Sequence, residues 1–263
     1  MPRVAPGRLL AITGGHRFDA ASFTAMLDDV AASLGWEWKH AAQPDAQSWL
    51  RPEHTGTWDA IVLYDIPGLA LARGSEPVAS APSADTSAAL LALLEAGQGI
   101  VALHHALAGW PAWDSWADLL GGRFLYAPGT LHGDFVPASG YRMDTYHVDL
   151  AATSHPVCDG VEPFGVDDEL YLCPVFEDRV TPLLATSAAI DAASMIDTYR
   201  EVRFGERVPA QPQPASQLLG WCREPGASRI VYLLPGHGPS TMEHPQYRRL
   251  LANACAWVSG STR

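Results

Sequence analysis

Histidines occur in three short turns of this sequence, each directly after a run typical of a buried strand. The turns are Thr13-Gly14-Gly15-His16, Leu103-His104-His105 and Leu234-Pro235-Gly236-His237-Gly238. Histidine titrates near neutral pH and is the commonest metal ligand, so these turns offer general acids, general bases or cation ligands. A fourth segment, Val166-Asp167-Asp168-Glu169-Leu170-Tyr171, adds carboxylates beside an apolar stretch.

The spacing of apolar residues predicts the elements that position these turns. Buried strands are expected at residues 8–13, 60–64, 99–103 and 229–234, with further strands at 36–40, 145–150 and 182–186. Helices are expected from about residue 20 to Gly35, at 86–96, from Pro111 to about 120, and at 245–258. Residues 67–85 and 204–216 are expected to be loops. This order is typical of an α/β protein with a mostly parallel sheet.

The carboxyl ends of parallel strands meet at one edge of a sheet, where ligands of such folds bind. We therefore expect one cleft at this edge to be lined by His16, one or both of His104 and His105, Glu169 and His237. The alternatives are structural: His16 bonds the backbone of its own turn, and the carboxylates form a solvated acidic turn.

Composition narrows the classes of partner. The 263 residues include 17 basic and 29 acidic side chains, a formal net charge of −12. This field repels phosphate backbones and anionic lipid, so we expect neither nucleic acid nor a membrane as partner. A chain of this length can fold without a disulfide bond or a bound metal. Because the sequence contains no internal repeat and no linker, we predict one domain over residues 1–263.

The cysteines predict no disulfide and no nucleophile. Their spacing contains no CxxC pair, and none lies on a recognisable strand-to-helix turn. Isolated thiols of this kind are typical of a reducing cytoplasm, which is the expected location. The four residues are Cys158, Cys173, Cys222 and Cys255.

Several blocks, in order along residues 10–258, resemble the ThuA-like (trehalose utilization) family. The central block is the strand from Gly99 that runs into His104-His105-Ala106. The others are Thr13 to His16, Val62 to Asp65, Trp110 to Trp113, Leu120 to Gly122, Ser154 to Val157 with Gly160, Asp168 to Tyr171, Pro235 to His237, and the last helix. The sequence departs from the family pattern at residues 67–85 and 187–216, where we expect insertions able to reshape the pocket.

The resemblance implies a flavodoxin-like, three-layer α/β/α fold similar to class I glutamine amidotransferases. In those enzymes a cysteine nucleophile occupies the turn that here holds the two adjacent histidines, so thiol-based amide transfer is not expected. The family is associated with trehalose and related disaccharides, often beside dehydrogenases that make 3-keto sugars. A small sugar is therefore the expected substrate, and a homo-oligomer is compatible with the sequence.

Two functions follow from these residues. The first is a hydrolase or an isomerase or lyase acting on a glycoside or keto sugar. One of His104 and His105 is its general base, and Glu169 orients that base or acts as acid. The expected substrate-binding residues are His16, Trp110, Asp168 and His237, with Trp113 as a further aromatic face or a core residue. The second is a non-catalytic sugar-binding or assembly module. No cofactor is certain, but three histidines and a carboxylate are a permissible set for a divalent metal such as zinc.

Overall fold

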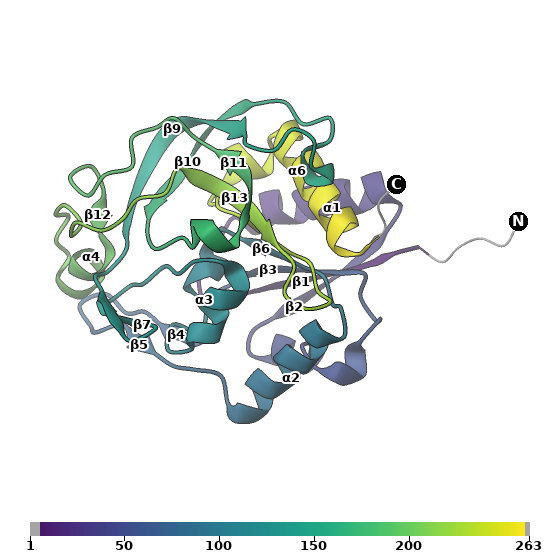
Figure 1. The fold of residues 1–263 in the computed structure, drawn as a ribbon, viewed down its shortest axis with the longest axis horizontal. Helices are drawn as coiled ribbons and strands as arrows, with labels where there is room; N and C mark the ends of the chain where they lie inside the picture. Colours follow the sequence, from purple (N-terminus) through teal and green to yellow (C-terminus); the bar gives the residue numbers. More distant parts are fainter. Residues whose placement is uncertain (1–5, 261–263) are drawn as a thin grey trace, which may run out of the picture.

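A ten-stranded sheet crosses the molecule in the computed structural model, which describes residues 6–260 (Figure 1). Along the path β10-β9-β11-β13-β14-β6-β3-β1-β2, every strand pairs with its neighbours, and β12 pairs with β9. The strands are β1 (Arg8–Gly14), β2 (Glu37–Ala42), β3 (Ala60–Asp65), β6 (Ile100–Leu103), β9 (Gly140–Leu150), β10 (Phe164–Leu172), β11 (Thr181–Ala185), β12 (Ile196–Asp197), β13 (Leu218–Arg223) and β14 (Ile230–Leu233).

The parallel half of the sheet runs from β14 through β6, β3 and β1 to β2. Every residue of β3, β6 and β14 is buried, because helices cover both faces of these strands. Their continuous apolar runs predicted this, and the predicted α/β class with a parallel sheet is confirmed. The turns after β1, β6 and β14 consequently lie at the same edge.

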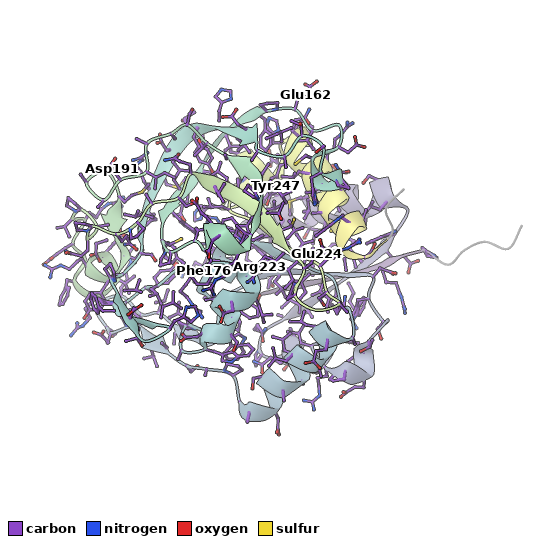
Figure 2. The ribbon with its side chains drawn as sticks, viewed as in Figure 1. Glu162, Phe176, Asp191, Arg223, Glu224 and Tyr247 are labelled. Atoms are coloured by element: carbon purple, nitrogen blue, oxygen red, sulfur yellow. The ribbon has the colours of Figure 1, made fainter. Side chains whose placement is uncertain are left out.

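Helices lie on both sides of the parallel strands (Figure 1). On one side α1 packs against α6, and on the other lie α2 and α3. The helices are α1 (Ala20–Leu34), α2 (Ala84–Glu95), α3 (Asp114–Leu120), α4 (Thr198–Phe204), α5 (Pro239–Met242) and α6 (Pro245–Val258), with five short 3-10 helices at Asp45–Trp49, Pro52–His54, His104–Ala108, Pro156–Cys158 and Glu177–Arg179. Tyr247 of α6, labelled in Figure 2, is fully buried, and its hydroxyl donates to the carbonyl of Pro235 (2.7 Å).

The helix expected to open at Pro111 begins instead at Asp114. The reason is Arg123, which is 1% exposed and whose guanidinium donates to three preceding carbonyls. These carbonyls belong to Gly109, Trp110 and Trp113, at 2.7, 3.1 and 2.6 Å. The carbonyls of Trp110 and Trp113 each also accept from the backbone N–H three residues on (2.9 and 3.0 Å), so the segment forms tight turns, and Trp110 has φ 43°.

Antiparallel strands extend the sheet beyond β14. The sequence pattern predicted only part of β9 and neither β10 nor β13. The acidic run Asp167 to Glu169 interrupts the apolar pattern of β10, and Gly220 interrupts that of β13. Four strands separate β10 from β6 along the sheet, yet residues of β10 contact the turn after β6. The antiparallel half therefore curls back over the carboxyl edge.

The regions expected to be loops contain small elements. Residues 67–85 include the hairpin β4 (Leu69–Ala70) with β5 (Val78–Ala79), and a second hairpin joins β7 (Gly129–Leu131) to β8 (Asp134–Val136). The insertion at 187–216 contributes β12 and α4. Within residues 6–260, no helix combines the length and apolarity that crossing a membrane requires.

Candidate active site

His104 lies where β6 ends and a 3-10 helix begins. Its side chain is 0% exposed, and its φ of 44° is a left-handed conformation that non-glycine residues seldom adopt. Two hydrogen bonds hold the residue there. Its ring Nδ1 donates to the carbonyl of Leu234 (2.6 Å), and its own carbonyl accepts from the hydroxyl of Tyr232 (2.9 Å). Because a carbonyl only accepts, Nδ1 carries a proton and Nε2 presents a lone pair when the ring is neutral.

The Nε2 atom of His104 meets side chains from two other segments. It lies 3.2 Å from Oε2 of Glu169 and 3.2 Å from Nδ1 of His237. The Oε2 and Nδ1 atoms are themselves 3.4 Å apart. Glu169 is 8% exposed, whereas the side chain of His237 is 37% exposed. His237 is thus the member of this group that solvent reaches most easily.

His105 lies beside this group with one ring nitrogen unbonded. Its Nδ1 is 3.1 Å from the hydroxyl of Tyr171, which is also 2.8 Å from Nε2 of His104. When that hydroxyl donates its one proton to His104, or to the carboxylate of Glu169, it accepts the Nδ1 proton of His105. The Nε2 lone pair of His105 is then free, and this atom has no hydrogen-bond partner among residues 6–260.

His16 completes the cluster of rings. Its ring centroid lies 4.4 Å from that of His105 and 4.7 Å from that of Tyr64. Its Nε2 is 3.0 Å from the carbonyl of Tyr64, and its Nδ1 is 3.1 Å from the carbonyl of Arg17. His16 therefore bonds to backbone carbonyls, as the structural alternative expected, and it also lies beside His105.

Asp168 is fully buried and anchors the turn that carries His237. Its two carboxylate oxygens accept from the backbone N–H groups of Gly236 (2.9 Å) and His237 (3.1 and 3.2 Å) and from the hydroxyl of Thr241. Gly236 has φ +138°, and a Cβ there would lie 2.8 Å from the Tyr247 hydroxyl. Asp168 thus contacts the turn itself, and its expected contact with a sugar remains a prediction.

The electrostatics separate the two adjacent histidines. Burial, with the charges of the other histidines, places the pKa of His105 well below its usual value. Burial also disfavours charge on His104, but hydrogen bonding to Glu169 and its charge outweigh burial, so the pKa of His104 is raised. Burial would raise the pKa of Glu169, yet the bond to His104 lowers it on balance. Burial lowers the pKa values of His16 and His237. The cluster therefore contains a histidine–carboxylate pair beside a neutral imidazole.

Of the two tryptophans considered for sugar contacts, Trp110 is 8% exposed and packs against Gly68, whereas Trp113 lines a cavity of about 540 Å³. Tyr126 also lines this cavity. Its ring packs on Phe124 (centroids 5.2 Å apart), which packs on Tyr171 (4.3 Å). Among residues 6–260, no histidine lines the cavity, and these packed rings lie between it and the histidine cluster.

A larger cavity, of about 920 Å³, lies elsewhere, between α1, α6 and residues 153–159. None of the predicted site residues lines it. We therefore place the candidate site at the histidine cluster, where groups able to transfer protons converge, and not at the larger hollow.

The cysteines are buried free thiols. Burial raises the pKa of Cys158 to about 11 and those of Cys173, Cys222 and Cys255 to about 12. Thiols with such pKa values are scarcely ionised at neutral pH, and the thiolate is the nucleophile. The prediction of no disulfide among them is confirmed.

Sequence reasoning missed three supporting side chains. Tyr171 belongs to a block that carries the family resemblance, but nothing marked its hydroxyl as a partner of both adjacent histidines. Tyr64 donates to the carbonyl of Gly236 (2.9 Å), and Arg123 holds the segment after the 3-10 helix. For Arg123, the one sequence signal was its position directly after Gly121-Gly122.

Fold and site together define an α/β protein with a histidine–carboxylate cluster at the carboxyl edge of its parallel strands. The family model ThuA, described as trehalose utilisation, matches residues 9–258. The chain belongs to the ThuA family.

Solved structures show the same fold. A ThuA-like protein from Parabacteroides merdae aligns with 97% of this chain and 90% of its own, with a TM-score of 0.65 and 17% identity. One from Bacteroides uniformis aligns with 97% of this chain and 92% of its own, with a TM-score of 0.64 and 18% identity. A cytoplasmic protein from Salmonella typhimurium covers 95% of this chain and 99% of its own, with a TM-score of 0.58 and 11% identity. No curated protein matches the sequence.

Proposed function

We propose that this protein is an enzyme of carbohydrate metabolism that removes a proton from a sugar carbon adjacent to a carbonyl group. The substrate class is a keto form of trehalose or of a related disaccharide. Membership of a family described as trehalose utilisation supports a sugar as the substrate. The histidine cluster supports removal of a proton as the chemical step.

The observation that carries the proposal is the free Nε2 atom of His105. A general base needs a neutral ring with an unshared lone pair and a fixed orientation. Burial keeps His105 neutral, and its Nδ1 contact with the Tyr171 hydroxyl fixes the ring. His104 is bonded through both nitrogens, which makes it the less suitable base.

In the proposed step, Nε2 of His105 takes the proton and the C–H electron pair forms the double bond of an enolate. The carbonyl electron pair moves onto its oxygen, which takes the proton of the hydroxyl group on the deprotonated carbon. Return of the proton from the imidazolium to the former carbonyl carbon then leaves the carbonyl group on the neighbouring carbon, which is an isomerised sugar. In a 3-keto disaccharide the enolate can instead expel the glycosidic oxygen, which takes the proton and leaves as the second sugar. In either outcome His105 returns to its neutral form.

The cavity lined by Trp113 and Tyr126 is the proposed place for the rest of the sugar. Its volume of about 540 Å³ falls in the range of small-molecule sites, roughly 300–1,000 Å³. Aromatic faces suit the apolar C–H faces of sugar rings, and Tyr126 connects this wall to Tyr171. Trp110, also expected to contact the sugar, is 8% exposed and does not line this cavity.

The test is incubation of the purified protein with trehalose, related disaccharides and their 3-keto forms, with product analysis by NMR. We expect a keto form to be isomerised or cleaved, and His105→Ala to lose this activity. The matched control is His147→Ala, because His147 is an exposed histidine outside the cluster. Binding of these sugars without formation of any product would contradict the proposed catalytic activity and would support a non-catalytic sugar-binding module. Equal activity of His105→Ala and the control would contradict the proposed base.

A further inference from the structure

Three potential metal-ligand atoms from three segments lie at nearly equal separations. Nε2 of His104 is 3.2 Å from Nδ1 of His237 and 3.2 Å from Oε2 of Glu169, and the last two atoms are 3.4 Å apart. The residues come from the turn after β6, from β10 and from the turn after β14. The fold thus assembles a triangle that no local sequence motif contains.

Hydrogen bonds cannot account for all three sides of this triangle. If only one ring nitrogen carries a proton, the other ring nitrogen faces the carboxylate as two acceptors. If both carry protons, two N–H donors face each other across 3.2 Å. If neither does, all three atoms are acceptors. With an ionised carboxylate, every protonation state leaves at least one unfavourable pair.

A bound cation removes this conflict because all three lone pairs then point at one centre. In a tetrahedral site with ligands at 2.0–2.1 Å, the ligand atoms are about 3.3–3.4 Å apart. In an octahedral site with the same bond lengths, neighbouring ligands are about 2.9 Å apart. The observed 3.2, 3.2 and 3.4 Å fit the tetrahedral value better. We propose that His104, His237 and Glu169 bind one divalent cation of the zinc class.

The surroundings have the features of a metal site. His104 donates its other ring proton to the carbonyl of Leu234, as metal-bound histidines usually do to a carbonyl or carboxylate. Asp168 fixes the backbone of His237 through the N–H of that residue. Outer contacts of this kind orient ligands before the metal binds.

His105 lies beside the three proposed ligands, with its ring centroid 4.2 Å from that of His104 and 5.4 Å from that of His237. Ligand atoms of His104, His105 and His237 all lie within 4.8 Å of one another, but His105 is engaged through Nδ1 with Tyr171. A site with three protein ligands and one open position is typical of catalytic zinc. The cation would stabilise the oxygen of an enolate there. This use rests on the proposed function, whereas cation binding does not.

The test is metal binding without any sugar. Protein treated with a chelator is titrated with Zn²⁺ in a calorimeter and with Co²⁺ in a visible spectrophotometer, since tetrahedral Co²⁺ absorbs far more strongly than octahedral Co²⁺. We expect one cation per chain, a tetrahedral Co²⁺ spectrum and a raised unfolding midpoint. His237→Ala and Glu169→Gln should weaken binding by at least about 100-fold, beyond the loss of an outer-shell partner. His237 is partly exposed, so its variant should fold, which circular dichroism checks.

Two further variants make the assignment specific. His147→Ala should bind Zn²⁺ like the unaltered protein, and His105→Ala should keep one cation per chain. Absence of stoichiometric binding to the unaltered protein would overturn the proposal. Binding unaffected by both His237→Ala and Glu169→Gln would also overturn it. Cation binding without turnover of any sugar would support the site while contradicting the proposed function.

Discussion

The Nε2 atom of His104 lies 3.2 Å from the Nδ1 atom of His237, although 133 positions separate the two residues in the chain. Parallel pairing of β6 with β14 causes this approach, because Leu103 pairs with Leu233 and both turns begin just beyond. Strand pairing thus brings the histidines of two separate turns into one site. The following predictions test what that site does.

The two adjacent histidines should respond differently to substitution. His105→Ala should lower turnover by about 10²–10⁴-fold, the usual contribution of a general base, with little change in the unfolding midpoint. His104→Ala should mainly destabilise the fold and weaken ligand binding, because His104 is fully buried and bonded to Leu234 and Glu169. Rates and thermal melts of both variants check this. Full activity in both would contradict the assigned roles.

Asp168→Asn should destabilise the protein by about 2–4 kcal/mol. An amide in place of the carboxylate sets an NH₂ group against the backbone donors of Gly236 and His237, which leaves buried donors unsatisfied. Urea unfolding measures the change. Asp167→Asn is the matched control, since Asp167 is exposed and should stay within about 0.5 kcal/mol. Equal stability of the two variants would show that Asp168 does not anchor the turn.

Asp65 should make stability depend on pH. Burial raises the pKa of its carboxyl group to about 7. Oδ2 accepts from Gln43 (2.8 Å), but Oδ1 has no hydrogen-bond partner among the described residues, 6–260. Between about pH 4 and pH 7 the folded protein therefore binds this proton more than the unfolded chain does, so the free energy of unfolding falls as pH rises.

Asp65→Asn should remove this part of the pH dependence, worth a few kcal/mol across the range. Urea unfolding at pH 4, 5.5, 7 and 8 compares the variant with the unaltered protein. Asp45→Asn, at an exposed aspartate, should follow the unaltered curve. Parallel curves for Asp65→Asn and the unaltered protein would contradict the prediction.

The aromatic cavity should affect sugar binding more than turnover. Trp113→Ala removes an indole from the cavity wall and should raise KM about tenfold, with a smaller change in kcat. The control is Phe135→Ala, because Phe135 is 74% exposed and does not line this cavity. Steady-state kinetics with the keto sugar measure both. An unchanged KM in Trp113→Ala would place the sugar elsewhere.

The parallel half of the fold was predictable because its strands are buried on both faces and read as continuous apolar runs. Ala60–Asp65 and Ile100–Leu103 are examples in which every residue is buried. By contrast, Phe164–Leu172 contains three consecutive acidic residues, Asp167 to Glu169, and this charged run, of which Asp168 and Glu169 are buried, hid it as a strand. The strand lies over the carboxyl edge because the antiparallel half of the sheet bends back, and no local sequence pattern predicts that bend.

The candidate site was predictable in its members but not in their contacts. Strand-end turns on parallel strands brought His104 and His237 to one edge, as expected. The burial of Asp168 beneath its turn, and the bridging hydroxyl of Tyr171, depend on how β10 is placed. The guanidinium of Arg123 reshaped the start of α3 through contacts that apolar periodicity does not report.

The most direct test of the account is deuterium exchange in a keto sugar. The protein is incubated in D₂O with 3-keto trehalose, and NMR follows the hydrogens on the carbons beside the carbonyl. We expect exchange or elimination at one such carbon with the unaltered protein and with His147→Ala, and loss of both with His105→Ala. Bound sugar with no exchange and no product, or exchange that persists in His105→Ala, would contradict it.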